Sequence, residues 1–321
     1  MTKKIAYTFG LDTYYFKKGV RRLLLLTVVY NDDREDIIDG INKVREYFRY
    51  KNINIGISES IDSNTHFVKI YCDEEISPKL LNVFNIHMAN ILYNVVIEEF
   101  YKKDILGFLS DTYFFLKFDE IKDIKQSSLD ALRGEERVID ENSIYCMNKK
   151  NAVIDKIVEC INENKEININ GFITFRMKEL KEDLESIIDK VVEKYMVDKE
   201  YNEFIKLLKY FVEVQESKIG KINLIIDNSG EYSVQDEDGN DITLKLFSDL
   251  SDLRYKESTN MDDMLISVLI TNSPEKITIH CVENCKNNEL IDTIEKVFTD
   301  RVNFCNDCKE CKKIKSSIHR V

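Results

Sequence analysis

The hydrophobic and polar positions of the first 75 residues repeat with strand-like and helix-like periods. Residues 5–9 and 23–30 are apolar runs that predict strands, and the second is apolar enough for a central strand. Apolar side chains at helical spacing predict a helix that follows an N-cap at Asp32-Asp33 and ends near Tyr50. Residues 53–58 and 66–72 flank Asp62-Ser63-Asn64, a hairpin signal. We therefore expect a small sheet with helices on one side.

The next ninety residues read as helices. Ser77-Pro78 is a helix start with proline at the first position, and the apolar residues that follow cover more than one face, as in a core helix. Two charged helical segments follow the aromatic run at 113–115, and Gly134-Glu135-Glu136 is the predicted break between them.

Residues 172–216 carry the strongest helical period in the chain. Apolar positions three and four apart run from Met177 to Tyr195 and again from Phe204 to Val212. Because a helix of some 45 residues exceeds the usual length in globular proteins, we predict two packed helices that break near Asp198.

The hydrophobic period changes to two after Gly220. Residues 222–226, 231–234 and 242–247 predict three strands, joined by turns at Asn228-Ser229-Gly230 and Asp238-Gly239. A helix over 261–270, a strand over 277–280, a helix over 290–298 and a strand over 302–304 complete the pattern. The last three of these elements form a β-α-β unit.

These elements place the chain in the α+β class. We predict a small N-terminal sheet-and-helix part, a central helical block, and a C-terminal β-hairpin meander with a β-α-β unit and a cysteine-rich tail. The corresponding domains are residues 1–110, connecting helices over 111–165, and residues 166–321, which hold the helical block and the C-terminal α/β region.

Composition and charge narrow the class of protein further. With 321 residues, 43% of them hydrophobic, and two prolines, the chain is not intrinsically disordered over most of its length. A net charge of −12 disfavours binding of nucleic acid by the whole surface, although both ends are locally basic. The longest apolar stretch is too short to span a membrane, and the first residues lack the apolar run of a secretion signal. We therefore expect a cytoplasmic protein that does not contact a membrane.

The sequence contains none of the common catalytic motifs. It has no dinucleotide-binding glycine motif, no P-loop and no nucleophile elbow, and its four histidines never pair at metalloprotease spacing. The acidic run that starts at Asp236 places its glycine too early for a calcium loop, so a hairpin turn explains it better. These absences favour a non-enzymatic protein.

Five cysteines near the C-terminus are the candidate site. Cys305, Cys308 and Cys311 are spaced C-x2-C-x2-C, and Cys281 and Cys285 lie upstream, which gives a pattern close to that of a zinc ribbon. If strands 277–280 and 302–304 are parallel neighbours, the cysteines that follow them emerge at the same sheet edge. All five thiols could then converge on a structural Zn²⁺ that fixes the lysine-rich tail.

Three interpretations of these thiols stay open from the sequence. They are a structural zinc site, ordinary reduced thiols, and an iron–sulfur or redox site whose fourth thiolate would come from Cys281 or Cys285. His280 is either a further ligand or a strand-end histidine without function. The remaining cysteines are interpreted as small core residues: Cys72, Cys146 and Cys160.

The C-terminal half resembles a known family. The segment from Asn170-Gly171-Phe172 to Arg176, the segment from Tyr201 to Val212, and residues 265–280 are similar to the YtxC-like sporulation proteins. So is Asp300-Arg301-Val302, which leads into the terminal cysteines. The likeness covers residues 165–321 well and the N-terminal part by length and layout. The terminal cysteine triplet belongs to it, whereas Cys281 and Cys285 are not part of the family pattern.

The resemblance implies a cytoplasmic protein of endospore-forming bacteria, and it carries no biochemical activity. Together with the missing catalytic motifs, it leads us to expect a non-enzymatic sporulation protein that binds a protein partner. The alternative is a metal- or iron–sulfur-dependent redox sensor or enzyme centred on Cys305, Cys308 and Cys311.

Overall fold

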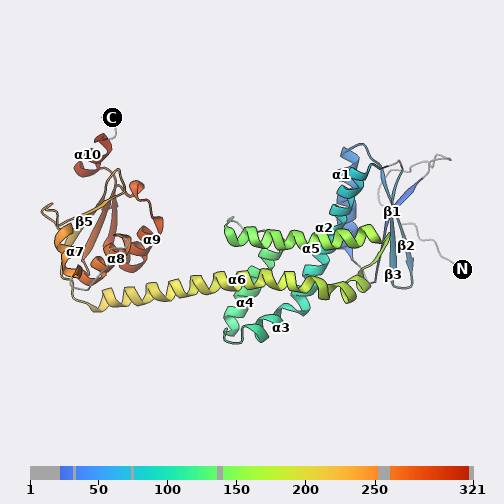
Figure 1. The fold of residues 1–321 in the computed structure, drawn as a ribbon, viewed down its shortest axis with the longest axis horizontal. Helices are drawn as coiled ribbons and strands as arrows, with labels where there is room; N and C mark the ends of the chain where they lie inside the picture. The colour runs from blue at the N-terminus through green and yellow to red at the C-terminus, as the bar shows by residue number, and fades with distance from the viewer. Residues whose placement is uncertain (1–21, 32–33, 74–75, 136–139, 252–260, 318–321) are drawn as a thin grey trace. The chain divides into compact units, whose positions relative to one another are not determined.

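The computed structural model describes residues 22–31, 34–73, 76–135, 140–251 and 261–317. The chain divides into two compact units, Met1–Tyr195 and Met196–Val321. It has the predicted α+β class, with an N-terminal sheet and helix part, a central helical block and C-terminal strands (Figure 1). The finer division at residues 110 and 165 stays a prediction.

The first unit contains a four-stranded sheet of order β2-β3-β1-β4. Its strands are β1 (Leu23–Asn31), β2 (Ile55–Asp62), β3 (Thr65–Cys72) and β4 (Glu166–Asn168). β1 is central, as its apolar run predicted: it pairs antiparallel to β3 and parallel to β4, and residues 25–30 are all buried. The predicted hairpin is also confirmed, because β2 and β3 pair antiparallel.

Two helices follow the strands of this sheet in the predicted order. Helix α1 (Glu35–Tyr50) buries Ile37, Ile41, Val44 and Phe48 at helical spacing. Helix α2 (Pro78–Lys103) starts at proline, and the Ser77 side chain caps it by accepting a hydrogen bond from the Leu80 N–H at 3.4 Å. The predicted strand at 5–9 and the predicted cap at Asp32-Asp33 lie outside the described residues.

Helix α2 is a core helix. Among the described residues it is also the helix that is long and apolar enough to cross a membrane, yet 56% of its most apolar stretch is buried inside the protein. It packs against α1 and α5, and the Tyr93 hydroxyl donates to the Leu132 carbonyl at 2.7 Å. A helix that is apolar on several faces and covered by its neighbours is the pattern of a protein interior.

The central helices are separated where the sequence predicted a break. After α3 (Ile105–Thr112), helix α4 (Phe118–Arg133) ends at Gly134, whose φ of 72° is the left-handed conformation that favours glycine. Helix α5 (Glu141–Glu163) then begins at Asp140, whose carboxylate accepts the Ser143 N–H at 2.7 Å.

The predicted break near Asp198 is wrong, because α6 (Ile169–Val214) is one continuous helix of 46 residues. No glycine or proline occurs between residues 172 and 214, so nothing in the local sequence ends the helix. Its first half buries Leu184 and Ile188 in the first unit, whereas its second half contributes Ile205 and Val212 to the core of the second. Because each half is buried in a core, the helix is stable at a length that helix propensity alone would not support.

The second unit is built on a sheet of order β6-β5-β7-β8. Its strands are β5 (Lys221–Ile226), β6 (Tyr232–Gln235), β7 (Lys276–His280) and β8 (Val302–Cys305). β5 pairs antiparallel to β6 and parallel to β7, and β7 pairs parallel to β8. With α9 (Asn288–Phe298) between β7 and β8, the predicted β-α-β unit is confirmed. The predicted helix over 261–270 is α8 (Met261–Asn272).

The third strand predicted over residues 242–247 is wrong, because α7 (Thr243–Ser251) occupies this segment. The Ile242 carbonyl accepts the Leu246 N–H at 2.9 Å, which closes the first turn of this helix, and the Asp241 carboxylate just before it accepts the Thr243 N–H at 2.8 Å. The alternation of Ile242, Leu244 and Leu246 suggested a strand, but Leu246 is buried while Leu244 is 86% exposed. Only a helical period separates these two leucines, so tertiary burial overrides the local alternation.

Short segments flank the parallel strands β7 and β8. A 3₁₀ turn, η1 (Val282–Asn284), follows β7, and another, η2 (Thr299–Arg301), precedes β8. Helix α10 (Lys309–Ser317) follows β8 after a short turn. The chain therefore brings α10 back to the edge where β7 and β8 end.

Candidate metal centre

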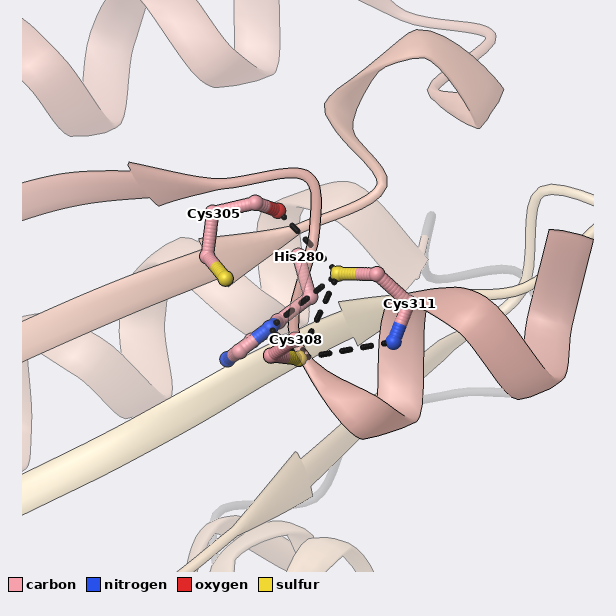
Figure 2. A group of neighbouring side chains, drawn as sticks. All are labelled: His280, Cys305, Cys308 and Cys311. Carbon is pink, nitrogen blue, oxygen red and sulfur yellow. Dashed lines mark hydrogen bonds between the residues drawn. The ribbon is translucent and has the colours of Figure 1, made fainter.

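Four side chains with metal-binding atoms converge at the carboxyl edge of β7 and β8. They are His280, Cys305, Cys308 and Cys311, and their ligand atoms all lie within 4.8 Å of one another (Figure 2). This is the sheet edge at which the sequence predicted that cysteines would meet. No other group of this kind occurs within the described ranges of the chain.

Each residue of the cluster is placed by the end of an element. His280 is the last residue of β7 and Cys305 the last of β8, and the two are opposite each other in the parallel register. Cys308 precedes α10, and Cys311 lies in the first turn of that helix. The Cys311 N–H points at the Cys308 sulfur at 3.4 Å, so Cys308 caps the start of α10.

The contacts within the cluster match the edges of a zinc-centred tetrahedron. Zn–S bonds of about 2.3 Å and Zn–N bonds of about 2.0 Å place two sulfurs about 3.8 Å apart and a sulfur and a nitrogen about 3.5 Å apart. Cys308 Sγ lies 3.5 Å from Cys311 Sγ, and the two sulfurs lie 3.3 and 3.5 Å from His280 Nδ1. These three distances are close to the edges of such a tetrahedron, and the fourth ligand atom, Cys305 Sγ, lies within 4.8 Å of the other three.

Burial gives His280 the charge state that a metal ligand needs. The side chain is nearly fully buried, and burial lowers the pKa of its imidazole below the ordinary value. The ring is therefore neutral at pH 7, with an unprotonated nitrogen available for coordination.

The pKa values of Cys308 and Cys311 are shifted in opposite directions, although burial acts to raise both. Burial acts to raise the pKa of Cys308, but hydrogen bonds from the Cys311 N–H and from the Cys311 and Cys305 thiols outweigh it and leave the pKa lowered. Burial raises the pKa of Cys311 to about 12, with smaller contributions from the neighbouring Cys308 and Cys281 side chains. A bound cation would favour the deprotonated form of the thiols that ligate it.

Neither of the two upstream cysteines predicted as ligands belongs to the four-donor group, although Cys281 lies next to it. Cys281 is buried against Cys311, whose pKa its thiol helps to raise, but it is not part of the four-donor group. Its φ of 55° turns the chain away directly after β7. Cys285 lies elsewhere, with its sulfur 3.2 Å from the Asn287 carbonyl oxygen and 3.7 Å from the Tyr232 hydroxyl.

For His280, the sequence allows two interpretations, a metal ligand or a strand-end histidine without function. The usable signal was its position as the last residue of its strand, because that position places its side chain at the edge where Cys305 emerges. Cys72 and Cys146 are buried, as expected of core residues, whereas Cys160 is half-buried and lies outside the buried core. The Asp236 carboxylate accepts the N–H groups of Asp238 and Asn240, as expected of the predicted turn.

Side-chain contacts also hold α10 near the sheet. The Asn228 amide, from the β5–β6 turn, donates to the Ile314 carbonyl at 2.8 Å. Lys315 pairs with Glu283 at 2.9 Å and donates to the Asn306 carbonyl at 2.9 Å. These contacts are exposed, so each adds little stability by itself.

The second unit is thus a small α/β domain whose sheet edge carries a Cys₃His donor set. The sequence model of the YtxC-like family matches residues 86–303, more than half of the chain, and the chain therefore belongs to that family. The match ends two residues before Cys305.

A relative in Bacillus subtilis (strain 168) carries the name "Uncharacterized protein YtxC". It is 23% identical to this chain over 222 residues, which cover 67% of this chain and 75% of the relative. No solved structure matches the chain.

Proposed function

We propose that His280, Cys305, Cys308 and Cys311 bind one Zn²⁺ that fixes α10 to the sheet of the second unit. The observation that carries the proposal is the closed donor set: four ligand atoms lie within 4.8 Å of one another. Structural zinc sites have four protein ligands, whereas catalytic sites have three and leave a position for water. A full set of soft thiolate donors with one imidazole also suits Zn²⁺ better than Mg²⁺ or Ca²⁺.

The composition of α10 explains why an ion is needed there. Its nine residues are KECKKIKSS, and Cys311 is the buried side chain among those that the structure describes in this helix. A helix this short and this rich in lysine has almost no apolar surface with which to hold itself to a sheet. Metal–thiolate bonds supply that attachment, because a structural ion contributes its binding energy to folding.

At the level of the whole protein, we propose a non-enzymatic cytoplasmic role in sporulation through a protein partner. The chain belongs to the YtxC-like family, and the resemblance described from the sequence is what implies a role in sporulation. A metal site closed by four protein ligands, with no position left for water or substrate, supports a role without catalysis. A pull-down across a sporulation time course tests this part. Specific capture of a sporulation protein is expected, and a pull-down without one at every time point contradicts the proposal.

Metal analysis of anaerobically purified, tag-free protein tests the centre itself. We expect about one zinc per chain, lost together with thermal stability when Cys305, Cys308 and Cys311 are all replaced by serine. The matched control is Cys285→Ser, a cysteine of the same unit outside the cluster, which should retain the zinc. Iron with visible absorption would overturn the zinc assignment in favour of a redox or iron–sulfur site, and protein without any metal would refute the centre.

A further inference from the structure

The His280 imidazole contacts the cluster with one ring nitrogen and a neighbouring strand with the other. Nδ1 faces the sulfurs of Cys308 and Cys311 at 3.3 and 3.5 Å (Figure 2). Nε2 faces away from them and lies 3.2 Å from Oδ1 of Asn223, on β5. The ring therefore spans from the cluster to the strand that pairs with β7 on its other side.

The partners of Asn223 decide which nitrogen carries the proton. Its amide group donates through Nδ2 to the Asp236 carbonyl at 3.2 Å, which fixes Oδ1 as the atom that faces the histidine. A carbonyl oxygen can only accept, so Nε2 must be the protonated nitrogen of the neutral ring. Nδ1 is then left with its lone pair directed at the sulfurs.

We propose that Asn223 is a positioning residue of the metal centre, and that it makes His280 a ligand through Nδ1. This inference rests on the proposed zinc site. Metal-binding histidines commonly donate their second ring N–H to a protein oxygen, which fixes the tautomer and the ring orientation. Asn223 supplies that oxygen from outside the β-α-β unit, and the turn at Asp236 holds the asparagine in place.

The inference links two parts of the sequence that the cysteine pattern does not connect. Asn223 lies 57 residues before His280 and more than eighty before the cysteines, in a strand that carries no metal-binding motif. The register of β5 and β7 brings it to the histidine: Asn223 pairs with Thr278, and Ile225 pairs with His280.

The first test reads the tautomer directly in the full chain. Long-range ¹H–¹⁵N correlation NMR of histidine side chains, on ¹⁵N-labelled protein, distinguishes the two tautomers. Comparison with the His280→Gln variant identifies the His280 signal among the four histidines. We expect a proton on Nε2 in metal-free protein and, after addition of Zn²⁺, a shift of Nδ1 that marks coordination. A proton on Nδ1, or coordination through Nε2, overturns the inference.

The second test compares zinc affinities by competition with a chromophoric chelator. Asn223→Leu removes the acceptor and should weaken zinc binding by about 10- to 100-fold, the usual effect of losing such a partner. Asn223→Asp keeps an oxygen toward Nε2, so it should retain the Nε2–H tautomer and an affinity close to that of the unmodified protein. The matched control is Asn303→Leu, the same substitution at an exposed position of β8, which should leave affinity and tautomer unchanged.

The outcomes separate this inference from the proposed zinc site. Unmodified protein that binds zinc, with an Asn223→Leu variant of equal affinity, overturns the role of Asn223 and leaves the zinc site standing. Unmodified protein that binds no zinc refutes the zinc site and, with it, a positioning role for Asn223. If Asn223→Leu does not fold, the tautomer of the unmodified protein and the Asn223→Asp affinity still decide the question.

Discussion

His280 and Cys305 lie opposite each other at the ends of two parallel strands, β7 and β8. This register brings an imidazole and a thiol, 25 residues apart in sequence, to one sheet edge. Helix α10 then returns Cys308 and Cys311 to the same edge, where their sulfurs contact His280 Nδ1. Two donors of the centre therefore lie at the ends of paired strands, and the other two lie at the start of α10.

The first prediction separates His280 from Cys281 as the fourth ligand. His280→Gln should weaken zinc binding by more than the roughly 10- to 100-fold that loss of an outer contact costs, because it removes a donor. Cys281→Ala should retain one zinc per chain, since this thiol lies outside the four-donor group. Zinc competition on both variants checks this, and loss of zinc in Cys281→Ala with retention in His280→Gln would reverse the assignment.

The second prediction tests the helix that replaced a predicted strand. Leu246→Ala should lower the free energy of unfolding by about 2–5 kcal/mol, because Leu246 is buried in the core of the second unit. Leu244→Ala, two residues away, should change it by less than about 0.5 kcal/mol, because this side chain is 86% exposed. Denaturant unfolding measures both.

Leu244→Ala is also the control for that comparison. In a strand the two leucines would share a face, so equal effects of the two substitutions would favour the strand that the alternating pattern suggested. A large loss of stability for Leu246→Ala, with little change for Leu244→Ala, would show that the two leucines lie on different faces, as they do in a helix.

The sequence predicts most of the second unit because its elements are short and strongly patterned. The parallel β-α-β unit and the meeting of cysteines at its edge follow from period and connection rules alone. The role of His280 stays open at that stage, because an isolated histidine has no spacing signal, and its strand-end position points to the cluster only once β7 and β8 are paired in register. Spacing alone also groups Cys281 and Cys285 with the ligands, because it does not reveal the left-handed conformation of Cys281, whose φ is 55°.

The two wrong elements have different origins. Over residues 242–247 the local alternation indicates a strand, whereas burial of Leu246 in the core of the second unit favours a helix. Tertiary contacts of this kind outweigh propensities of a few tenths of a kcal/mol per residue. Near Asp198 the local pattern is helical, and the predicted break came from helix length alone. The usual length of helices in globular proteins does not indicate whether each half of α6 is buried in a separate hydrophobic core.

The third prediction tests the continuity of α6 at its exposed middle. Asp198→Pro should cost about 3 kcal/mol or more, because proline removes a backbone hydrogen bond and clashes with the preceding turn. Circular dichroism should show a loss of helix, and thermal unfolding should begin at a lower temperature.

The control for Asp198→Pro is Asp198→Ala, which keeps the backbone donor and should be neutral or slightly stabilising. If the proline variant instead matched the alanine variant in helix content and stability, α6 would contain a break near this residue.

The last prediction concerns Asp183, which joins α6 to α5 in the first unit. Its two carboxylate oxygens accept from Lys149 at 2.9 Å and from Lys156 at 2.6 Å, and only 12% of its side chain is exposed. Burial acts to raise the pKa of Asp183, but the hydrogen bonds and charges of the two lysines outweigh it and lower the pKa below 3.8.

A lowered pKa in the folded state fixes the direction of the pH dependence. The carboxylate stabilises the fold fully above the pKa of the unfolded chain, near 3.8, and this contribution is lost as the pH falls through the folded value. Asp183→Asn should therefore lower the free energy of unfolding by about 1–3 kcal/mol at pH 7, and the difference from the unmodified protein should shrink below about pH 4.

The control is Asp198→Asn, which changes an exposed acid of the same helix and should alter the free energy of unfolding by less than about 0.5 kcal/mol. Denaturant unfolding at a series of pH values measures the difference. A gap between Asp183→Asn and the unmodified protein that stayed constant down to pH 2 would mean that the asparagine is destabilising for packing reasons, and that the carboxylate charge is not what joins the two helices.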